Sequence, residues 1–439
     1  MDMANKQAVD IKKIKELIKK ALDENREDII ALGDAVMASP EIGYREEKTS
    51  ALVRRVFDGL EIEYEYPLAV TGVKAKLFGK EHKYNVAIIG EMDALSCVGH
   101  PYANGSGLAH ACGHNAQVAA MLGAAIAIKK SGVMNELDGD ITFIAAPAEE
   151  FIDLDYRRSL RKDGKISYFG GKQELIAIGA FDDVDMAMMV HAKPNESGKK
   201  MYVRGHNLGF IAKTLTLKGK AAHGSTPHLG TNALNAAALT IIGIHSNRET
   251  FRDEERVRIH PIITKGGDVV NSVPDEVTID TYVRGATFEG INKGDAAVER
   301  SLAGACQIIG AAYEIENVKG YLPIEENTEL SSVFEENTKA VLGEDSLVFG
   351  EEITGSTDVG DLSAIIPTIQ PSVGGFIGNL HSNKFEICDK ETAYLAPALI
   401  MAYTACELLF AGADGARQVK ANFKPRMTKQ EYINYLKGE

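Results

Sequence analysis

The chain has 439 residues, of which 45% are hydrophobic and 25% charged, and its formal net charge is -14. This length exceeds the size at which one hydrophobic core usually stops growing, so we expect two domains. The acidity argues against a nucleic-acid partner, because phosphate binding needs basic patches and no basic stripe interrupts the sequence.

The N-terminal segment predicts an amphipathic surface helix. Apolar residues recur there at helical spacing among lysines, namely Ile11, Ile14, Leu17, Ile18 and Leu22. The segment has no apolar run of the signal-peptide type, and we find no stretch of about 18 apolar residues that would cross a membrane. The five cysteines are scattered along the chain and odd in number, so they do not form the pattern of a disulfide framework. We therefore expect a cytoplasmic protein without a membrane partner.

Up to about residue 200, short apolar runs alternate with helical segments. Residues 84–90, 140–146 and 185–190 are strand-like, and each is followed by polar residues. The Ala-rich segment 115–130 is long enough for a helix, with Asn115 placed to cap it. This alternation predicts an α/β fold with a mixed, mostly parallel sheet and helices on both faces.

From about Gly205 the pattern changes. Residues 211–218 and 277–284 alternate apolar and polar side chains, which is typical of a sheet with one wet face, and 232–244 between them is helical. We therefore predict a small α+β domain inserted into the larger one. The predicted bounds are 205–321 for the insert, and 1–204 with 322–439 for the larger domain.

Several strand-like runs of the larger domain end in groups that can bind metal. Because ligand sites in open α/β sheets lie beyond the carboxyl ends of the strands, we expect these groups to converge. They are Glu91 and Asp93, Glu149 and Glu150, His191 and, near the C-terminus, His381.

The densest group is His110, Cys112 and His114 in LAHACGHNAQ, just before the Ala-rich helix. Cys112 and His114 lie two residues apart, so an extended segment directs both side chains toward one face. Thiolate and imidazole are good zinc ligands, and carboxylates add the oxygen donors that manganese also accepts. Taken singly, Cys112 reads as a small buried apolar residue and each histidine as a packed or exposed one.

Glu149 and Glu150 follow a buried-strand pattern, where unpaired carboxylates are costly. Adjacent acids are commonly a solvated loop, but here one can bind a metal while its neighbour acts as a general base. In the insert, His223, Asn271 and Arg284 stand out. A guanidinium is well shaped for a substrate carboxylate, although Arg284 taken alone reads as a surface residue.

The motifs GEMDAL, HACGHN, PAEE, VHAKP, GKAAHGSTP, GSTDVGD and NLHS occur in this order. Together they resemble the aminoacylase and carboxypeptidase-G-like metallopeptidases over nearly the whole chain. The resemblance is closest to the amidohydrolase branch, with its indoleacetyl-amino-acid hydrolases, aminobenzoyl-glutamate hydrolases and related dipeptidases. It implies a catalytic domain, an inserted lid through which protomers form a homodimer, and a divalent zinc or manganese cofactor.

The resemblance also implies roles for individual residues. Glu149 matches the general base, and Asp93 matches the carboxylate that orients a ligand. His223 matches a lid histidine, often supplied across the dimer to the developing oxyanion, and Asn271 and Arg284 match lid residues that hold the substrate's carboxylate. The residues that match metal ligands are Cys112, His114, Glu150, His191 and His381.

The chain departs from the family pattern in three places. Ser96 stands where the family usually has Pro, and Glu91 takes the place of a metal-binding His of other branches, which leaves one or two ions open. Segment 151–182 is longer than the usual Gly-rich stretch. Its basic residues could meet an acidic substrate, but a solvated charged loop is the simpler interpretation; they are Arg157, Arg158, Arg161 and Lys162.

The sequence thus predicts a metal-dependent amidohydrolase that cleaves an N-acyl amino acid, an aminobenzoyl-glutamate-like compound or a dipeptide by metal-activated water. One alternative is a thiol amidase with Cys112 as the nucleophile and a nearby histidine as the base. It leaves the glutamate pair and His381 without a role. The other alternative is a catalytically inactive binding or regulatory relative, against which the intact set of ligands and base argues.

Overall fold

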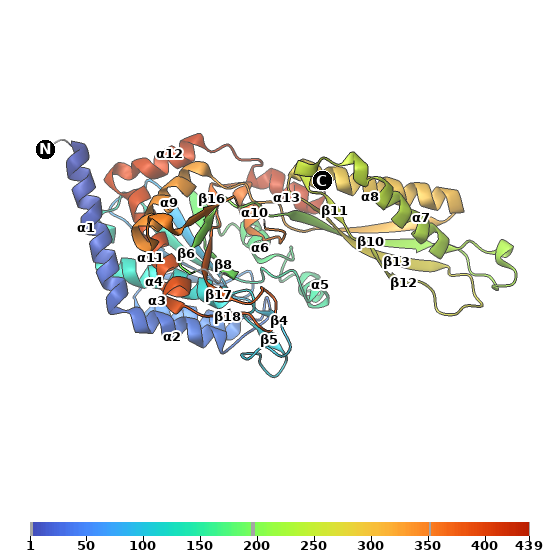
Figure 1. The fold of residues 1–439 in the computed structure, drawn as a ribbon, viewed down its shortest axis with the longest axis horizontal. Helices are drawn as coiled ribbons and strands as arrows, with labels where there is room; N and C mark the ends of the chain where they lie inside the picture. Colours follow the sequence, from blue (N-terminus) through green and yellow to red (C-terminus); the bar gives the residue numbers. More distant parts are fainter. Residues whose placement is uncertain (1–2, 195–197, 351–352, 439) are drawn as a thin grey trace. The chain divides into compact units, whose positions relative to one another are not determined.

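The computed structural model describes residues 3–194, 198–350 and 353–438, with side chains from residue 10 onward. The chain divides into two compact units (Figure 1). The first unit comprises Met1–Gly205, Glu325–Glu352 and Asp361–Glu439, and the second comprises His206–Ile324 and Ile353–Gly360. The sequence prediction placed the short segment 353–360 in the larger domain, but in the structure it belongs to the second unit. Backbone hydrogen bonds explain this, because Ile353 N donates to His206 O and Leu208 N donates to Gly355 O.

A six-stranded sheet forms the centre of the first unit, and its strand order is β1-β2-β6-β3-β7-β16. The four strands β6, β3, β7 and β16 run parallel to one another, whereas the pairs β1·β2 and β2·β6 are antiparallel. Strands β3 and β6 are buried along their whole length. The bounds are β1 Tyr64–Leu68, β2 Gly72–Leu77, β3 Asn85–Glu91, β6 Asp140–Ala146, β7 Met186–Met188 and β16 Thr368–Ile369.

Helix α4 (His114–Ser131) is the central helix of this unit and is buried from its first residue to Ile128. It packs on β3 and against α1 (Met3–Glu24), α2 (Arg26–Met37) and α11 (Ala396–Leu409). Its small alanine side chains let several elements approach it closely.

The predicted cap of α4 is wrong by two residues. Gly113, with φ 81°, takes the N-cap position, because the preceding turn needs a left-handed residue there. Asn115 lies inside the helix instead, where its side-chain amide donates to the Tyr394 hydroxyl at 2.9 Å and to Gly33 O at 3.3 Å.

The stretch Glu391–Leu409 is long and apolar enough to cross a membrane, contrary to the sequence expectation that no such stretch exists. It consists of a π-helical turn, Glu391–Leu395, that leads into α11. Almost all of it is buried against α4, α9 and other elements of the first unit, as is usual for the core helix of a globular domain.

Smaller elements complete the first unit. Strand β8 pairs with β17 in a second sheet of order β15-β9-β17-β18, and β4 pairs with β5 in a hairpin. The strands are β4 Leu95–Ser96, β5 Leu108–Ala109, β8 His191–Pro194, β9 Met201–Val203, β15 Leu347–Phe349, β17 Ser372–Ile377 and β18 Glu386–Ile387. The helices are α3 Glu47–Gly59, α5 Leu154–Lys162, α6 Gly171–Ala177, α9 Thr328–Leu342, α12 Asp414–Asn422 and α13 Lys429–Lys437. Helix α10 (Val359–Ser363) includes the last residues of segment 353–360 and the first residues of Asp361–Glu439.

The second unit is an antiparallel sheet of order β11-β13-β10-β14, with β12 also paired to β13. Helices α7 and α8 pack on each other and on β10 and β13, which explains the alternating burial along β13 and the second half of β10. The bounds are β10 Gly209–Lys218, β11 Arg258–Ile259, β12 Ile262–Lys265, β13 Glu276–Gly285, β14 Ala312–Lys319, α7 Ala233–Ser246 and α8 Phe288–Ile309. The predicted fold class, a mixed α/β domain plus an α+β domain, is confirmed.

Candidate metal centre

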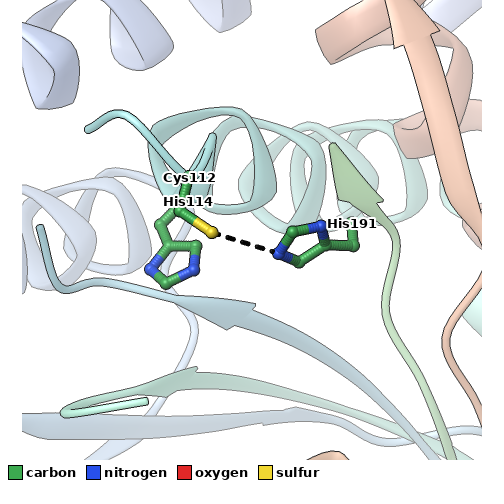
Figure 2. Close-up of side chains that lie close together, drawn as sticks. All are labelled: Cys112, His114 and His191. Atoms are coloured by element: carbon green, nitrogen blue, oxygen red, sulfur yellow. Dashed lines mark hydrogen bonds between the residues drawn. The ribbon is translucent and has the colours of Figure 1, made fainter. Parts of the chain in front are cut away.

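The first unit brings together side chains that lie as far apart in the sequence as Cys112 and His381. Cys112 and His114 come from the turn that enters α4, and His191 is the first residue of β8 (Figure 2). Glu150 follows β6, and His381 follows β17. The Cys112 Sγ atom lies 3.5 Å from His191 Nε2 and 3.3 Å from His381 Nε2.

These side chains form two groups of three donors that share Cys112. One group is Cys112, His114 and His191, and the other is Cys112, Glu150 and His381. Within each group the donor atoms all lie within 4.8 Å of one another. A thiolate between two such groups is placed to contact two cations at once, and each group mixes donors that suit zinc and related divalent ions.

Hydrogen bonds to backbone carbonyls fix the orientation of two of the imidazoles. The Nδ1–H group of His114 donates to Asp93 O at 2.8 Å, and that of His191 donates to Ala192 O at 2.9 Å. Because a carbonyl can only accept, each proton must lie on Nδ1, and each Nε2 then presents a lone pair to the cluster. This is the arrangement that metal-bound histidines usually show.

The electrostatics of the cluster favour an ionised thiol. Burial opposes ionisation of Cys112, but the imidazoles of His191 and His114 outweigh it and hold the pKa of the thiol well below its usual range. The hydrogen bond to Cys112, together with Glu150, raises the pKa of His381 to about 10. Burial, and then the charge of Cys112, raise the pKa of Glu150 to about 6. A thiolate is the form of cysteine that binds metal.

Two buried atoms test whether these residues fit a cation. In the part of the chain that the structure describes, His114 Nε2 and Glu150 Oε1 make no hydrogen bond. His114 Nε2 nevertheless lies 3.2 Å from a Glu91 oxygen, and Glu150 Oε1 lies 3.2 Å from His381 Nε2. Buried polar atoms are rarely left unpaired, and here each of the two belongs to one of the donor groups that share Cys112. The residues therefore fit a divalent metal.

Of the two histidines His381 and His110, only His381 belongs to the donor groups. His381 adopts φ 60°, a conformation that is strained for a non-glycine residue, and its N–H donates to Ala111 O at 2.8 Å. This bond ties the C-terminal loop to the HACGH segment. His110 is buried, but it belongs to neither group, and burial lowers the pKa of its imidazole to about 3.

The two remaining acidic residues predicted for the site also lie here. Glu149 Oε2 is 3.9 Å from His114 Nε2, and Glu149, Glu91 and His114 form a third group of possible donors. Asp93 Oδ1 lies 3.1 Å from His114 Nδ1, and its Oδ2 accepts from Glu150 N at 2.9 Å. Asp93 thus contacts two candidate ligands, namely the imidazole ring of His114 and the backbone amide of Glu150.

Sequence reasoning missed a buried ion pair beside His114. Lys172, on α6, places its Nζ atom 2.5 Å from Glu91 Oε1, and neither side chain is exposed. Gln117 donates to Glu91 Oε2 at 2.8 Å. Both oxygens of Glu91 therefore already have protein partners. Gln117 stands three residues after His114 and therefore lies on the same face of α4, so its position near the donor groups could have been predicted from the sequence. No pattern in the sequence places Lys172 near Glu91.

The interpretation of segment 151–182 as a solvated charged loop is wrong for Arg157. The segment contains α5 and α6, and the Arg157 side chain is fully buried. Its guanidinium donates to backbone carbonyls, at 2.7 Å in the case of Phe169 O. Arg157 is therefore a buried helix residue and not part of a solvent-exposed loop that could meet an acidic substrate.

In the second unit, Arg284 lies on β13 and is partly buried. Its Nη1 donates to the Ser356 hydroxyl at 2.8 Å, and the guanidinium lies 5.3 Å from the ring centroid of Phe210 and 5.2 Å from that of Tyr282. No acidic side chain among the described residues pairs with it. An aromatic cradle with free N–H donors suits a carboxylate ligand.

His223 and Asn271 are exposed neighbours in the second unit. A bridge pairs His223 with Ser272, and Gly224 N donates to Asn271 O at 2.7 Å. The Ser225 amide donates to His223 Nδ1 at 3.1 Å, so the proton of the neutral ring lies on Nε2. His223 thus presents an N–H donor to its surroundings. His223, Asn271 and Arg284 all belong to the second unit, whereas the donor groups around Cys112 belong to the first.

Residues 87–405 match the family model described as peptidase family M20/M25/M40. The chain is 26% identical to the Xaa-Arg dipeptidase of Mus musculus, over 97% of this chain and 96% of that protein. It is 28% identical to the N-acyl-L-amino acid amidohydrolase of Geobacillus stearothermophilus, over 71% and 81% of the two chains.

The fold is shared with a solved Bacillus subtilis protein whose description reads dinuclear metal binding peptidase from the M20 family. The TM-score is 0.69 at 22% identity, and the alignment covers 88% of this chain and 99% of that one. The family resemblance predicted from the motifs is confirmed by these matches.

Proposed function

The chain belongs to peptidase family M20/M25/M40 and is a metallopeptidase or amidohydrolase; from this premise we propose that it hydrolyses the amide bond of an N-acyl amino acid or a dipeptide at a two-ion site. The observation that carries the proposal is the sharing of Cys112 by two groups of three buried donors.

We assign one ion to Cys112, His114 and His191 and the other to Cys112, Glu150 and His381. Zinc or manganese is the expected metal, since the groups combine thiolate, imidazole and carboxylate. Cations held there supply Lewis-acid polarisation of the amide carbonyl and make an attacking water more acidic. Glu91 is left out of both groups, because Lys172 and Gln117 already bind its carboxylate.

Glu149 is the proposed general base. It adjoins the ligand Glu150 in sequence and lies near His114, but it belongs to neither Cys112-centred group. We assign to its carboxylate the role of taking the proton of the attacking water and passing it to the leaving amine. Asp93 orients His114 and holds the backbone of Glu150, so it sets the geometry of both groups.

The second unit supplies the proposed substrate contacts. Through its Nε2–H group, His223 donates to the oxyanion that develops on the amide oxygen. Arg284 binds the carboxylate of the amino-acid half, and Asn271 assists it. The similar proteins support this substrate class, since one is an N-acyl-L-amino acid amidohydrolase and another an Xaa-Arg dipeptidase.

We further propose that the protein acts as a homodimer in the cytoplasm. The five free cysteines of the chain agree with a reducing compartment. Light scattering of the purified protein tests the dimer directly. A monomer mass at assay concentration would remove the expected route by which His223 reaches a partner's site.

A hydrolysis screen tests the function. N-acyl amino acids, aminobenzoyl-glutamate and dipeptides are incubated with protein that has been loaded with zinc or manganese. We expect turnover of at least one class, loss of turnover with a chelator, and recovery when metal is added back. Turnover that resists the chelator, together with an acyl group trapped on Cys112, would instead establish the thiol amidase. A metal-loaded protein that cleaves none of the substrates would favour the inactive relative.

A further inference from the structure

The backbone turn that carries Glu149 and Glu150 has an unusual conformation. Ala148, the residue before them, adopts φ 53°, in the left-handed region that favours glycine. Residues with side chains keep this conformation only where their surroundings enforce it, and such positions cluster at functional sites. The neighbours of Ala148 should therefore show what enforces the turn.

The buried carboxyl group of Glu46 holds the amide side of the turn. Ala148 N donates to Glu46 Oε1 at 2.8 Å, and the Thr71 hydroxyl donates to Glu46 Oε2 at 2.6 Å. Glu46 is fully buried, so water does not compete for these bonds. One oxygen of Glu46 thus accepts from the turn, and the other accepts from Thr71, which fixes the position of the Glu46 side chain.

A buried guanidinium holds the carbonyl side of the same turn. Arg157 Nη1 donates to Ala148 O at 3.4 Å and to Phe169 O at 2.7 Å, and Arg157 Nη2 donates to Glu150 O. Arg157 therefore binds the residue on each side of Glu149. It reaches the turn from α5, in the segment that departs from the family pattern.

Packing leaves the turn little room to move. A Cβ atom added at Gly43 would lie 2.7 Å from Arg157 Nη2 and 2.8 Å from Ala148 Cα. Gly171 N donates to Ala148 O at 3.1 Å, and a Cβ atom at Gly171 would collide with Pro147 O. The backbone at Gly43 and at Gly171 thus packs directly against the turn.

A purely supporting role for Arg157 does not explain its contacts. Burying a guanidinium is costly, and an apolar side chain would pack α5 without that cost. The Arg157 guanidinium instead donates to two carbonyls of the turn, Ala148 O and Glu150 O, and to Phe169 O, and the two turn carbonyls lie opposite the amide that Glu46 binds. The Glu46 carboxyl group and the Arg157 guanidinium therefore act on one three-residue segment from its two sides.

We propose that Glu46 and Arg157 are positioning residues that clamp Ala148–Glu150, and so fix Glu149 relative to the ligand Glu150. The roles of Glu149 and Glu150 rest on the proposed function, whereas the clamp rests on the contacts alone. A loosened clamp misplaces the base without removing any group that binds substrate. Its loss should therefore lower kcat and leave KM nearly unchanged.

The test compares Arg157→Met with Arg158→Met, the adjacent exposed arginine on α5. Amide hydrogen exchange of the metal-free proteins is followed in a peptide that covers residues 147–151. Exchange there should accelerate at least tenfold in Arg157→Met, but not in the control or in peptides from α4. With metal loaded, kcat should fall about 10- to 100-fold, the range that a base displaced by about an ångström produces, with KM changed less than threefold.

The pair Glu46→Gln and Glu46→Leu gives a second test that does not depend on Arg157. Gln keeps an oxygen acceptor for the Ala148 amide and should retain kcat within about threefold, whereas Leu should reproduce the Arg157→Met behaviour. The visible spectrum of cobalt-loaded protein should change in Glu46→Leu, because Glu150 moves.

Unchanged exchange at 147–151 in both Arg157→Met and Glu46→Leu would overturn the clamp, as would faster exchange with wild-type kcat. If wild-type protein hydrolyses no amide, the proposed function fails, but exchange and the cobalt spectrum still decide the clamp.

Discussion

Replacing Glu149 by Gln separates the general base from the metal ligands more cleanly than any other single change. The substitution keeps the size of the side chain and its neighbours but removes the group that accepts a proton. Glu149 Oε2 lies 3.9 Å from His114 Nε2 and takes no part in the two donor groups around Cys112. The metal content of Glu149→Gln should therefore equal that of the wild type.

The expected loss follows from the role of a positioned base. Proton transfer by such a group contributes about 10²- to 10⁴-fold to the rate, which corresponds to about 3–5 kcal/mol of barrier. Because Gln leaves substrate contacts intact, the loss should fall on kcat, with KM changed little.

The adjacent residue provides the matched control. Glu150→Gln makes the same chemical change one residue along the chain, but it removes a ligand of the group with Cys112 and His381. We expect metal analysis to show loss of one ion in Glu150→Gln and none in Glu149→Gln. Steady-state hydrolysis with saturating zinc or manganese supplies kcat and KM for both. A Glu149→Gln enzyme with kcat within tenfold of wild type would refute the assignment of the base.

Three further predictions concern residues away from the proton transfer. Lys172→Met leaves the buried Glu91 carboxylate without its ammonium partner, and urea unfolding should show a loss of about 3–5 kcal/mol; a loss below 1 kcal/mol would contradict the ion pair. Burial raises the pKa of Glu326 to about 7 from its ordinary value of 4.5, so the folded state keeps a proton that the unfolded chain releases, and this carboxyl's contribution to stability falls as pH rises from 4.5 to 7. Glu326→Gln should therefore gain stability relative to wild type by up to about 3 kcal/mol across that window, and a difference that does not vary with pH would contradict this. Arg284→Met should raise KM at least tenfold for substrates with a free carboxylate, but not for the same substrates as methyl esters, and equal effects on both would remove the proposed anchor.

The sequence was most informative about side chains at strand ends. Glu150 and His191 could be placed near each other because the carboxyl ends of parallel strands meet at one edge of a sheet. The apolar segments 140–146 and 185–190 that precede Glu150 and His191 distinguished these two polar residues from ordinary loop residues. The family motifs then joined His381, whose position more than 180 residues later no local pattern could connect to the others.

What the sequence could not show depends on tertiary contacts of charged residues. In the sequence Arg157 is one of several basic residues of an apparently solvated charged loop, yet it is buried and bound to carbonyls that lie on both sides of Glu149. Lys172 and Glu46 likewise gain their roles from partners distant in the sequence. Asn115 shows the same limit at a helix end, because a glycine turn displaced the cap and the Asn side chain found buried partners instead.

The most direct test of the metal centre is a crystal structure of zinc- or manganese-loaded protein with anomalous scattering measured at the absorption edge of the metal. Two peaks on opposite sides of Cys112 Sγ, one beside His114 and His191 and one beside Glu150 and His381, would agree with the assignment. Scattering that is absent, or that lies away from Cys112, would contradict it.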